Sequence, residues 1–356
     1  MKNVLIVIAL LCSFQLFSQT KVVKRNALRS NNFGITYSLP NTSIIVNVEV
    51  KKNTHKAGLY YNYADRYLGI KDVVTEDKVY YEIGNVHLYT KGVPDKDNTY
   101  IVEFRSGTVA PYAYLTEEGL LCSINAEFTP EESDMESDIK NRTAPLRATD
   151  ASVFSEELLM AGSIAKQAEV AARQIYRIRE SRMNILTGDA DNLPPDGEAM
   201  RIVIQHLEEQ ERALTNLFTG VISTETTYKD FTIIPYGNLE RDVLFRFSSH
   251  LGIIDADDFG GTPVYMNLTA TDIPEILDEK EKAKKERAMR RGIIYNIPGK
   301  ANVEIVMNNN SLHKGEILVA QFGNKEVLAA EMFEDRRQPV KVTFYPETGA
   351  IRQIIQ

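Results

Sequence analysis

Hydrophobic and small residues recur every three or four positions from Val153 to Leu186, which is the spacing of a helix with one buried face. The stripe consists of Phe154, Leu158, Ala161, Ala165, Ala168, Ala172 and Ile175. The same periodicity returns after Pro195, with Asp196 as the expected N-cap and Gly220 as the expected stop. The apolar face of this second helix carries Met200, Val203, Leu207, Leu214 and Leu217. The pattern therefore predicts a long antiparallel helical hairpin over residues 151–220.

On both sides of the predicted hairpin the chain is rich in β-branched and aromatic residues in short alternating runs, as strands are. Such runs occur at residues 44–50, 79–83, 100–104, 243–247 and 263–268. Residues 275–291 are densely charged, which predicts a solvated helix. We therefore expect an α+β fold in which a β-rich module at 20–128 and a second one at 221–356 are joined by the hairpin.

The two β-rich segments contain an internal repeat. The segment GITYSLPNTSIIVNVEVKKNTHK from Gly34 aligns without gaps to GIIYNIPGKANVEIVMNNNSLHK from Gly292, at a constant offset of 258 residues and with seven identities in twenty-three positions. Each copy also ends in a strand-turn-strand pattern, with a turn that contains Gly119 in the first copy and Gly349 in the second. We favour a divergent duplication of one β module over chance similarity.

The N-terminus reads as a secretory signal, because Lys2 is followed by an apolar run and then by a small and polar segment. The apolar run is too short to cross a bilayer. We expect residues 1–19 to be removed near Ser18 and Gln19, and the mature chain to be exported to the periplasm or the outer membrane. Residues 129–150 begin acidic and lack periodicity, which predicts a linker. The net charge of −8 argues against nucleic-acid binding.

The histidines are spread along the chain without the spacing of a metal-binding motif, so we assign no metal ligand and no cofactor. His206 and Glu209 share a helix face, but a surface histidine is the favoured interpretation. Asp255 and Asp257 resemble the start of a calcium-binding loop. However, Met266 occupies the position where that loop needs a bidentate glutamate.

Three aspartates, Asp189, Asp191 and Asp196, crowd the expected tip of the hairpin. We favour helix capping in a solvated turn over calcium binding, and we keep these residues as candidates for an interaction surface. Ser163 and Lys166 have the SxxK spacing of penicillin-interacting enzymes, but the serine is expected in mid-helix and the partner motifs are missing. Cys122 lies in a predicted strand, which favours a buried hydrophobic role. The sequence therefore gives no catalytic residue.

Several segments together resemble a known family of exported proteins. They are YSLP, YADRYLGI, AKQAEVAARQIYRIRESRMNILTGDADNLPPDGEAM, HLGIIDADDFGGTPVYMNL and ILVAQFG, in this order along the chain. The chain resembles the uncharacterised Bacteroidota family called domain of unknown function 4831. The resemblance implies a location in the cell envelope of a diderm bacterium, and it brings no catalytic residues.

We expect a non-enzymatic scaffold protein whose partners are other envelope proteins, such as the subunits of an outer-membrane complex. Duplicated sheets whose edges can accept an added strand and a long hairpin both favour this interpretation. One alternative is a hydrolase of an envelope polymer that uses carboxylates such as Asp255, Asp257 and Asp258. Another is a glycan-binding or small-ligand-binding protein that uses the tyrosines of the first β module.

The basic end of the charged helix is the candidate for an electrostatic contact. Its residues are Lys284, Lys285, Arg290 and Arg291. They could contact the acidic linker or the anionic head groups of a membrane surface, which would make this a peripheral membrane contact. The alternative is a solvated helix whose charges are paired within it.

Overall fold

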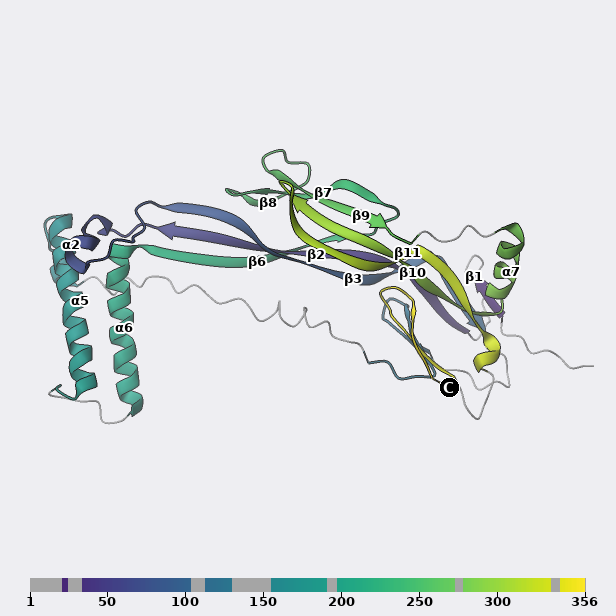
Figure 1. The fold of residues 1–356 in the computed structure, drawn as a ribbon. Helices are drawn as coiled ribbons and strands as arrows, with labels where there is room; N and C mark the ends of the chain where they lie inside the picture. The colour runs from purple at the N-terminus through teal and green to yellow at the C-terminus, as the bar shows by residue number, and fades with distance from the viewer. Residues whose placement is uncertain are drawn as a thin grey trace, which may run out of the picture.

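A computed structural model describes residues 21–24, 34–103, 113–129, 155–190, 197–272, 278–333 and 340–355. This part of the chain is mixed and mostly β, with strands in three sheets. The molecule is elongated: two long helices lie at one end, the sheets gather at the other, and three strands connect them (Figure 1). The predicted signal segment and nearly all of the predicted acidic linker lie outside the described residues.

The long strand β2 (Gly34–Lys56) lies at the centre of the first sheet and pairs along its length with β3 (Lys78–Glu103) on one side. On its other side, residues 44–56 of β2 pair with β6 (Val221–Ile233), and β1 (Lys21–Lys24) pairs with the far end of β3. All of these pairings are antiparallel, and the order of the sheet is β1-β3-β2-β6. Long runs of β-branched and aromatic residues explain why these segments form strands.

A second sheet packs against the middle of β2. It contains β7 (Leu239–Ser248), β8 (Gly252–Ile254), β9 (Thr262–Ala270), β10 (Gly292–Met307) and β11 (Asn310–Ala329), in the order β11-β10-β9-β7-β8. Alternate residues of β2 face this sheet. The shared core includes Ile44, Val46, Val48, Phe245, Val264, Met266, Leu268, Val303 and Ile305. The helix α7 (Glu279–Met289) connects β9 to β10 and lies at the far end of the molecule (Figure 1).

A third, small sheet combines two hairpins from distant parts of the chain. Its strands are β4 (Ala113–Leu115), β5 (Leu121–Ile124), β12 (Lys341–Phe344) and β13 (Ile351–Ile355), in the order β13-β12-β5-β4. It closes a second core at the start of β2 and β10, beside the short η3 helix (Ala330–Phe333). Because β6 pairs with β2 and β12 pairs with β5, two of the sheets combine strands from the segments 20–128 and 221–356, while the second sheet lies within 221–356.

The buried hydroxyl of Tyr37 ties β2 to β10 within this second core. It accepts a hydrogen bond from the Ile294 N–H at 2.9 Å and donates one to the Ile294 carbonyl at 3.0 Å. Burial raises the pKa of Tyr37 far above its usual range, so the hydroxyl stays neutral at physiological pH. Both polar groups of Ile294 are therefore satisfied in a place that water cannot reach.

We call the helical end of the molecule the head. It contains η1 (Tyr61–Tyr63), α2 (Ala64–Leu68), α4 (Glu156–Leu159), α5 (Ile164–Thr187) and α6 (Gly197–Thr219). The helices α5 and α6 lie side by side (Figure 1). Arg179 and Arg182 of α5 form ion pairs with Glu211 of α6, at 2.6 and 2.9 Å. The core of the head is built from Tyr60, Ala64, Leu158, Ala168, Ala171, Ala172, Ile175, Leu214 and Phe218.

The first long helix is shorter than the sequence pattern predicted. In the structure α4 ends at Leu159, and α5 begins only at Ile164, after Gly162 and Ser163. Ser163 is the N-cap of α5, since its hydroxyl accepts a hydrogen bond from the Lys166 N–H at 3.3 Å. A glycine followed by a strong N-cap residue restarts the helix there, which the apolar spacing alone did not reveal. Ser163 is therefore not a mid-helix residue.

Three strands connect the head to the sheets, and we call this segment the stalk. It consists of residues 51–56 of β2, 78–82 of β3 and 221–226 of β6, and it is covered only at its base, where Tyr81 packs against the core of the second sheet. The remaining sheet structure is the body. Of the stalk residues, all of which are described, only Asn53 is buried. Its amide donates to Glu82 at 2.9 Å, and its carbonyl oxygen accepts from Thr224 at 2.7 Å. Asn53 thus links all three strands through its side chain.

Two glycines allow the stalk and the head to meet closely. Gly220 ends α6 with a φ of 75°, and a Cβ atom added to it would lie 2.5 Å from the Lys56 carbonyl oxygen. A Cβ on Gly58 would lie 2.6 Å from the Leu217 carbonyl oxygen. That carbonyl accepts a hydrogen bond from the Tyr60 N–H at 2.6 Å. The end of α6 is therefore held directly against the chain that leaves β2.

Replacing Ala168 by phenylalanine should destabilise the head, because Ala168 is fully buried in its core. We expect a loss of about 1–3 kcal/mol of unfolding free energy, measured by urea denaturation followed by circular dichroism. Ala165→Phe, one turn earlier on the same helix at an exposed position, is the matched control and should change stability by less than about 0.5 kcal/mol. Equal effects of the two substitutions would show that α5 does not pack through this face.

Replacing Gly220 by alanine should strain the connection between head and stalk, since the new side chain meets a backbone oxygen at a positive φ. We expect a loss of about 1–3 kcal/mol, seen as a lower midpoint of unfolding. The control is Gly162→Ala, where no atom lies within 4 Å of the added Cβ. A Gly220→Ala protein as stable as the control would contradict the close approach described above.

Candidate functional site

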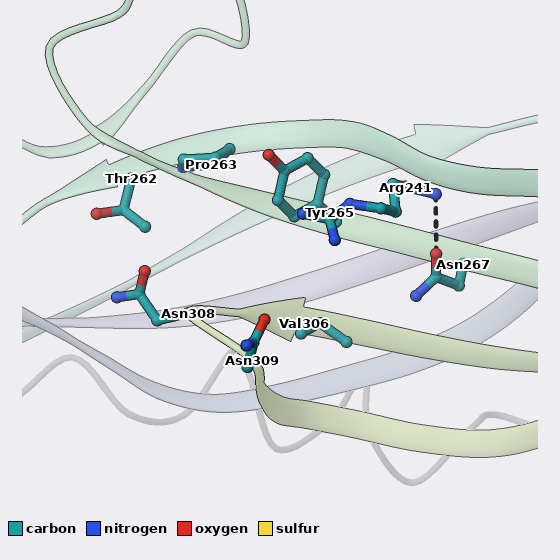
Figure 2. A pocket seen from close by; sticks show the side chains of 8 residues that line it. All are labelled: Arg241, Thr262, Pro263, Tyr265, Asn267, Val306, Asn308 and Asn309. Atoms are coloured by element: carbon teal, nitrogen blue, oxygen red, sulfur yellow. Dashed lines mark hydrogen bonds between the residues drawn. The ribbon is translucent and has the colours of Figure 1, made fainter.

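A polar hollow of about 250 Å³ opens on the outer face of the second sheet. The side chains that define its chemistry come from β7, β9 and the turn between β10 and β11 (Figure 2). They are Arg241, Thr262, Tyr265, Asn267, Asn308 and Asn309. We call this site the amide hollow.

Strand alternation and a tight turn place these side chains together. On β9, Val264, Met266 and Leu268 are buried in the core, so the residues between them, Tyr265 and Asn267, face away from it. The turn between β10 and β11 consists of Asn308 and Asn309, with φ values of 51° and 63°. Positive φ at both central positions is the mark of a type I′ turn, and asparagine accepts this backbone conformation more readily than most residues.

Arg241 completes the hollow from an irregular position on β7. The register of β7 against β9 shifts between Leu239 and Asp242, and Arg241 has a positive φ of 52° within this shift. Its backbone N–H donates to the Asn267 side-chain oxygen at 2.8 Å (Figure 2). Its guanidinium lies 4.5 Å from the centroid of the Tyr265 ring, at cation-π distance. No described residue forms an ion pair with Arg241.

A wider hollow of about 610 Å³ lies where the stalk meets the head. His55 and Tyr80 contact each other there, with 3.5 Å between the imidazole Nε2 and the phenol oxygen, and the Lys78 ammonium lies 5.1 Å from the Tyr80 ring centroid. Asp72 and Glu76 also line it. Charges of both signs are mixed on an open surface, so this hollow favours no particular ligand chemistry.

The basic residues chosen from the sequence lie on and just after α7, far from the amide hollow (Figure 1). Lys285 forms an ion pair with Glu326 of β11 at 2.8 Å, which attaches α7 to the body. Lys284 lies on the same helix, and Arg290 and Arg291 directly follow it. Asp278 caps the helix in a capping box with Glu281. The structure therefore brings these basic residues to one end of the molecule, with Lys285 already paired.

The described acidic candidates lie in two separate places, Asp189 in the head and Asp255, Asp257 and Asp258 on a loop of the body. Asp189 follows the end of α5, where its carboxylate accepts a hydrogen bond from Thr187 at 2.8 Å, while Asp191 and Asp196 lie outside the described residues. Asp255, Asp257 and Asp258 are exposed on the loop after β8. Asp258 accepts a hydrogen bond from the Gly260 N–H at 2.9 Å. Over the described ranges, no three His, Cys, Asp or Glu side chains are arranged to hold a metal ion.

Sequence reasoning missed the amide hollow. Its asparagines and its arginine have no recognisable motif, because their arrangement depends on strand pairing and on positive φ angles. The run Asn308-Asn309-Asn310 between two strand-like segments was the available signal, since it is typical of a tight hairpin turn. That signal predicts the turn, but it does not predict that Tyr265 and Arg241 lie beside it.

Cys122 is buried in β5, as its place in a strand predicted. Burial raises the pKa of its thiol to about 11. In the unfolded chain the thiol has its ordinary pKa of 9.0 and ionises above that pH. In the folded chain the thiol stays neutral until the pH approaches 11. The contribution of Cys122 to stability is present below pH 9 and falls as the pH rises from 9 towards 11.

We expect Cys122 of the folded protein to resist thiol reagents near neutral pH and to react fully in denaturant, because the reactive species is the thiolate. The measurement is the rate of labelling by a disulfide reagent with and without urea. A Cys122→Ala variant should also lose less stability than the wild type when the pH rises above 9. Rapid labelling of the native protein would contradict the burial of this side chain.

Comparisons with known proteins agree with the resemblance seen in the sequence. No curated protein and no solved structure matches the chain. The model of one family, described as a domain of unknown function (DUF4831), matches residues 33–352, which is most of the chain and includes the head and nearly all of the three sheets, while β1 lies before the match. The chain therefore belongs to the family called domain of unknown function 4831.

Proposed function

We propose that this protein is a non-enzymatic scaffold of the cell envelope, whose body and head bind different partners. The observation that carries the proposal is the stalk, which separates the head from the body (Figure 1). A three-stranded segment that is covered only at its base costs stability, and only its two packed ends can compensate for this. A shape of this kind suits a protein that must hold two binding surfaces apart.

The outer part of the helix pair supports the proposal that the head docks a protein. Met183 and Leu186 near the end of α5 are each 60% exposed, and Ile202 and Val203 near the start of α6 are 44% and 38% exposed. These residues lie at the end of the helix pair that is furthest from the stalk (Figure 1). Exposed apolar side chains on neighbouring helices can serve as a protein interaction surface. We propose that α5 and α6 act as a helical hairpin arm.

The body supports a second part of the proposal, that it arose by divergent duplication of one β module. The strands β2 and β10 begin at the first residue of the two aligned segments, and each forms a long hairpin with the next strand. The Ser38 N–H donates to the Gly119 carbonyl at 3.0 Å, and at the aligned position the Asn296 N–H donates to the Gly349 carbonyl at 3.0 Å. Both glycines have positive φ, at 88° and 72°. Two unrelated segments would not be expected to share this contact.

The envelope location is proposed from the signal pattern at the N-terminus and from the resemblance described above. The partners we propose are envelope proteins, including the subunits of an outer-membrane complex. A membrane surface at the basic end of α7 is a further proposed contact, because Lys284 lies on α7, Arg290 and Arg291 directly follow it, and α7 lies at the far end of the body (Figure 1). No helix among the described residues is long and apolar enough to cross a bilayer.

Replacing both Met183 and Leu186 by glutamate should abolish docking by the head, because two charges would have to be buried in an apolar interface. The measurement is quantitative mass spectrometry of proteins that co-purify with the tagged full chain from envelope fractions. We expect the main partner of the wild type to be lost. The control is Ser181→Glu with Asn184→Glu, which adds the same charge at exposed positions on another side of α5. Equal recovery of the partner with both double variants would reject the helix pair as the docking surface.

A further inference from the structure

We propose that the amide hollow binds an acidic saccharide, that is, a sugar that carries a carboxylate group. This inference goes beyond the scaffold function, because it assigns a ligand class to the body and concerns none of the residues of the head. It depends on side-chain amides and an arginine that have no hydrogen-bonding or acidic side-chain partner among the described residues, and on the size of the hollow.

The first observation is the unused hydrogen-bonding capacity of the amides. Neither the Asn308 nor the Asn309 side chain forms a hydrogen bond with a described residue, although the turn fixes the backbone of both. The oxygen of the Asn267 side chain is occupied by the Arg241 N–H, so its amide hydrogens are left for a ligand (Figure 2). Asn308 and Asn309 are exposed at the rim of the hollow, and donors and acceptors without partners among the described residues suit a ligand with several neutral hydroxyl groups.

The second observation is the state of Arg241. Its guanidinium is stacked beside the Tyr265 ring, which limits its motion without neutralising its charge. Among the residues that line the hollow, Arg241 alone is charged, and none of them is an aspartate or a glutamate. A guanidinium in this setting can bind a carboxylate with two parallel hydrogen bonds. The hollow therefore favours a ligand with one anionic group beside its hydroxyl groups.

The third observation is the size and the remaining lining of the hollow. A volume of about 250 Å³ is sufficient for one sugar ring but not for an extended ligand. Pro263 and the Tyr265 ring supply apolar surface on the same side (Figure 2), which suits the C–H face of a sugar ring. The lining has no glycine-rich loop and only one cation for the phosphates of a nucleotide, and it has no His, Cys or carboxylate for a metal ion. A carboxylated sugar matches all of these properties.

The test is a glycan array probed with the full chain, in which hexuronate-bearing and sialate-bearing oligosaccharides are compared with neutral ones of the same length. We expect saturable binding to at least one acidic class, and binding at least about tenfold weaker for its methyl ester, in which the carboxylate charge is removed. Absence of any preference for acidic over neutral oligosaccharides would overturn the proposal.

Two variants locate the binding on the protein. Arg241→Asn removes the guanidinium and keeps a residue that accepts a positive φ, so it should fold and should weaken acidic-glycan binding about tenfold or more. Tyr265→Leu should weaken the binding of both the acidic oligosaccharide and its methyl ester, because it removes the aromatic surface for the sugar ring. The control is Arg66→Asn in the head. Like Arg241, Arg66 is an exposed arginine that lies over a tyrosine ring, and its removal should leave glycan binding unchanged. Acidic-glycan binding that Arg241→Asn leaves unchanged would refute the assignment.

The result of the glycan-binding test does not depend on whether the scaffold proposal is correct. The amide hollow lies in the body, and the docking surface proposed for partner proteins lies at the outer end of the head (Figure 1). Arg241→Asn should therefore leave the co-purified partner unchanged, and the glutamate double variant of α5 should leave glycan binding unchanged. Loss of both activities in either variant would contradict the separation of the two sites.

Discussion

The continuity of β2 is the constraint on which the rest of the structure depends. A strand of 23 residues spans roughly 75 Å at about 3.3 Å per residue, far more than a typical strand of 5–6 residues. Its first residues, with Tyr37 and Leu39, belong to the core beneath the small sheet. The alternate residues Ile44, Val46, Val48 and Val50 belong to the core beneath the second sheet. The chain then leaves the stalk and places Tyr60 in the core of the head. One strand thus connects three separate cores in sequence.

The stalk is stable because both of its ends are fixed and because its polar side chains are satisfied. At the base, the turn between β7 and β8 braces β3, where the Tyr81 N–H donates to the Ser249 carbonyl at 2.7 Å. At the other end, Gly58 and Gly220 allow the backbone of α6 to contact the chain after β2. Between them, Asn53 connects the three strands. A stalk held in this way can transmit the orientation of the body to the head, which a flexible linker could not.

Local sequence patterns predicted where helices and strands form better than they predicted which strands pair with each other. The helices around Ala168 and Leu214 were predictable because their apolar residues repeat with the helical period, and Gly220 ends α6 as expected. The break before Ile164 was missed, because an apolar stripe says nothing about the Ser163 cap. The pairing of β2 with β6, and of β5 with β12, joins strands that are far apart in the sequence, so no local pattern contains it. The amide hollow was missed for the same reason, since it combines residues of β7, β9 and β10 with the turn between β10 and β11.

The central claim is that the stalk holds the head at a fixed position relative to the body. A double electron–electron resonance measurement tests it directly, with spin labels at Ser181 in the head and Ser249 in the body, both exposed, in a Cys122→Ala background. A rigid three-stranded stalk predicts a single narrow distribution of distances that does not change with ionic strength. A broad or bimodal distribution would show that the head moves independently of the body, and would contradict this account.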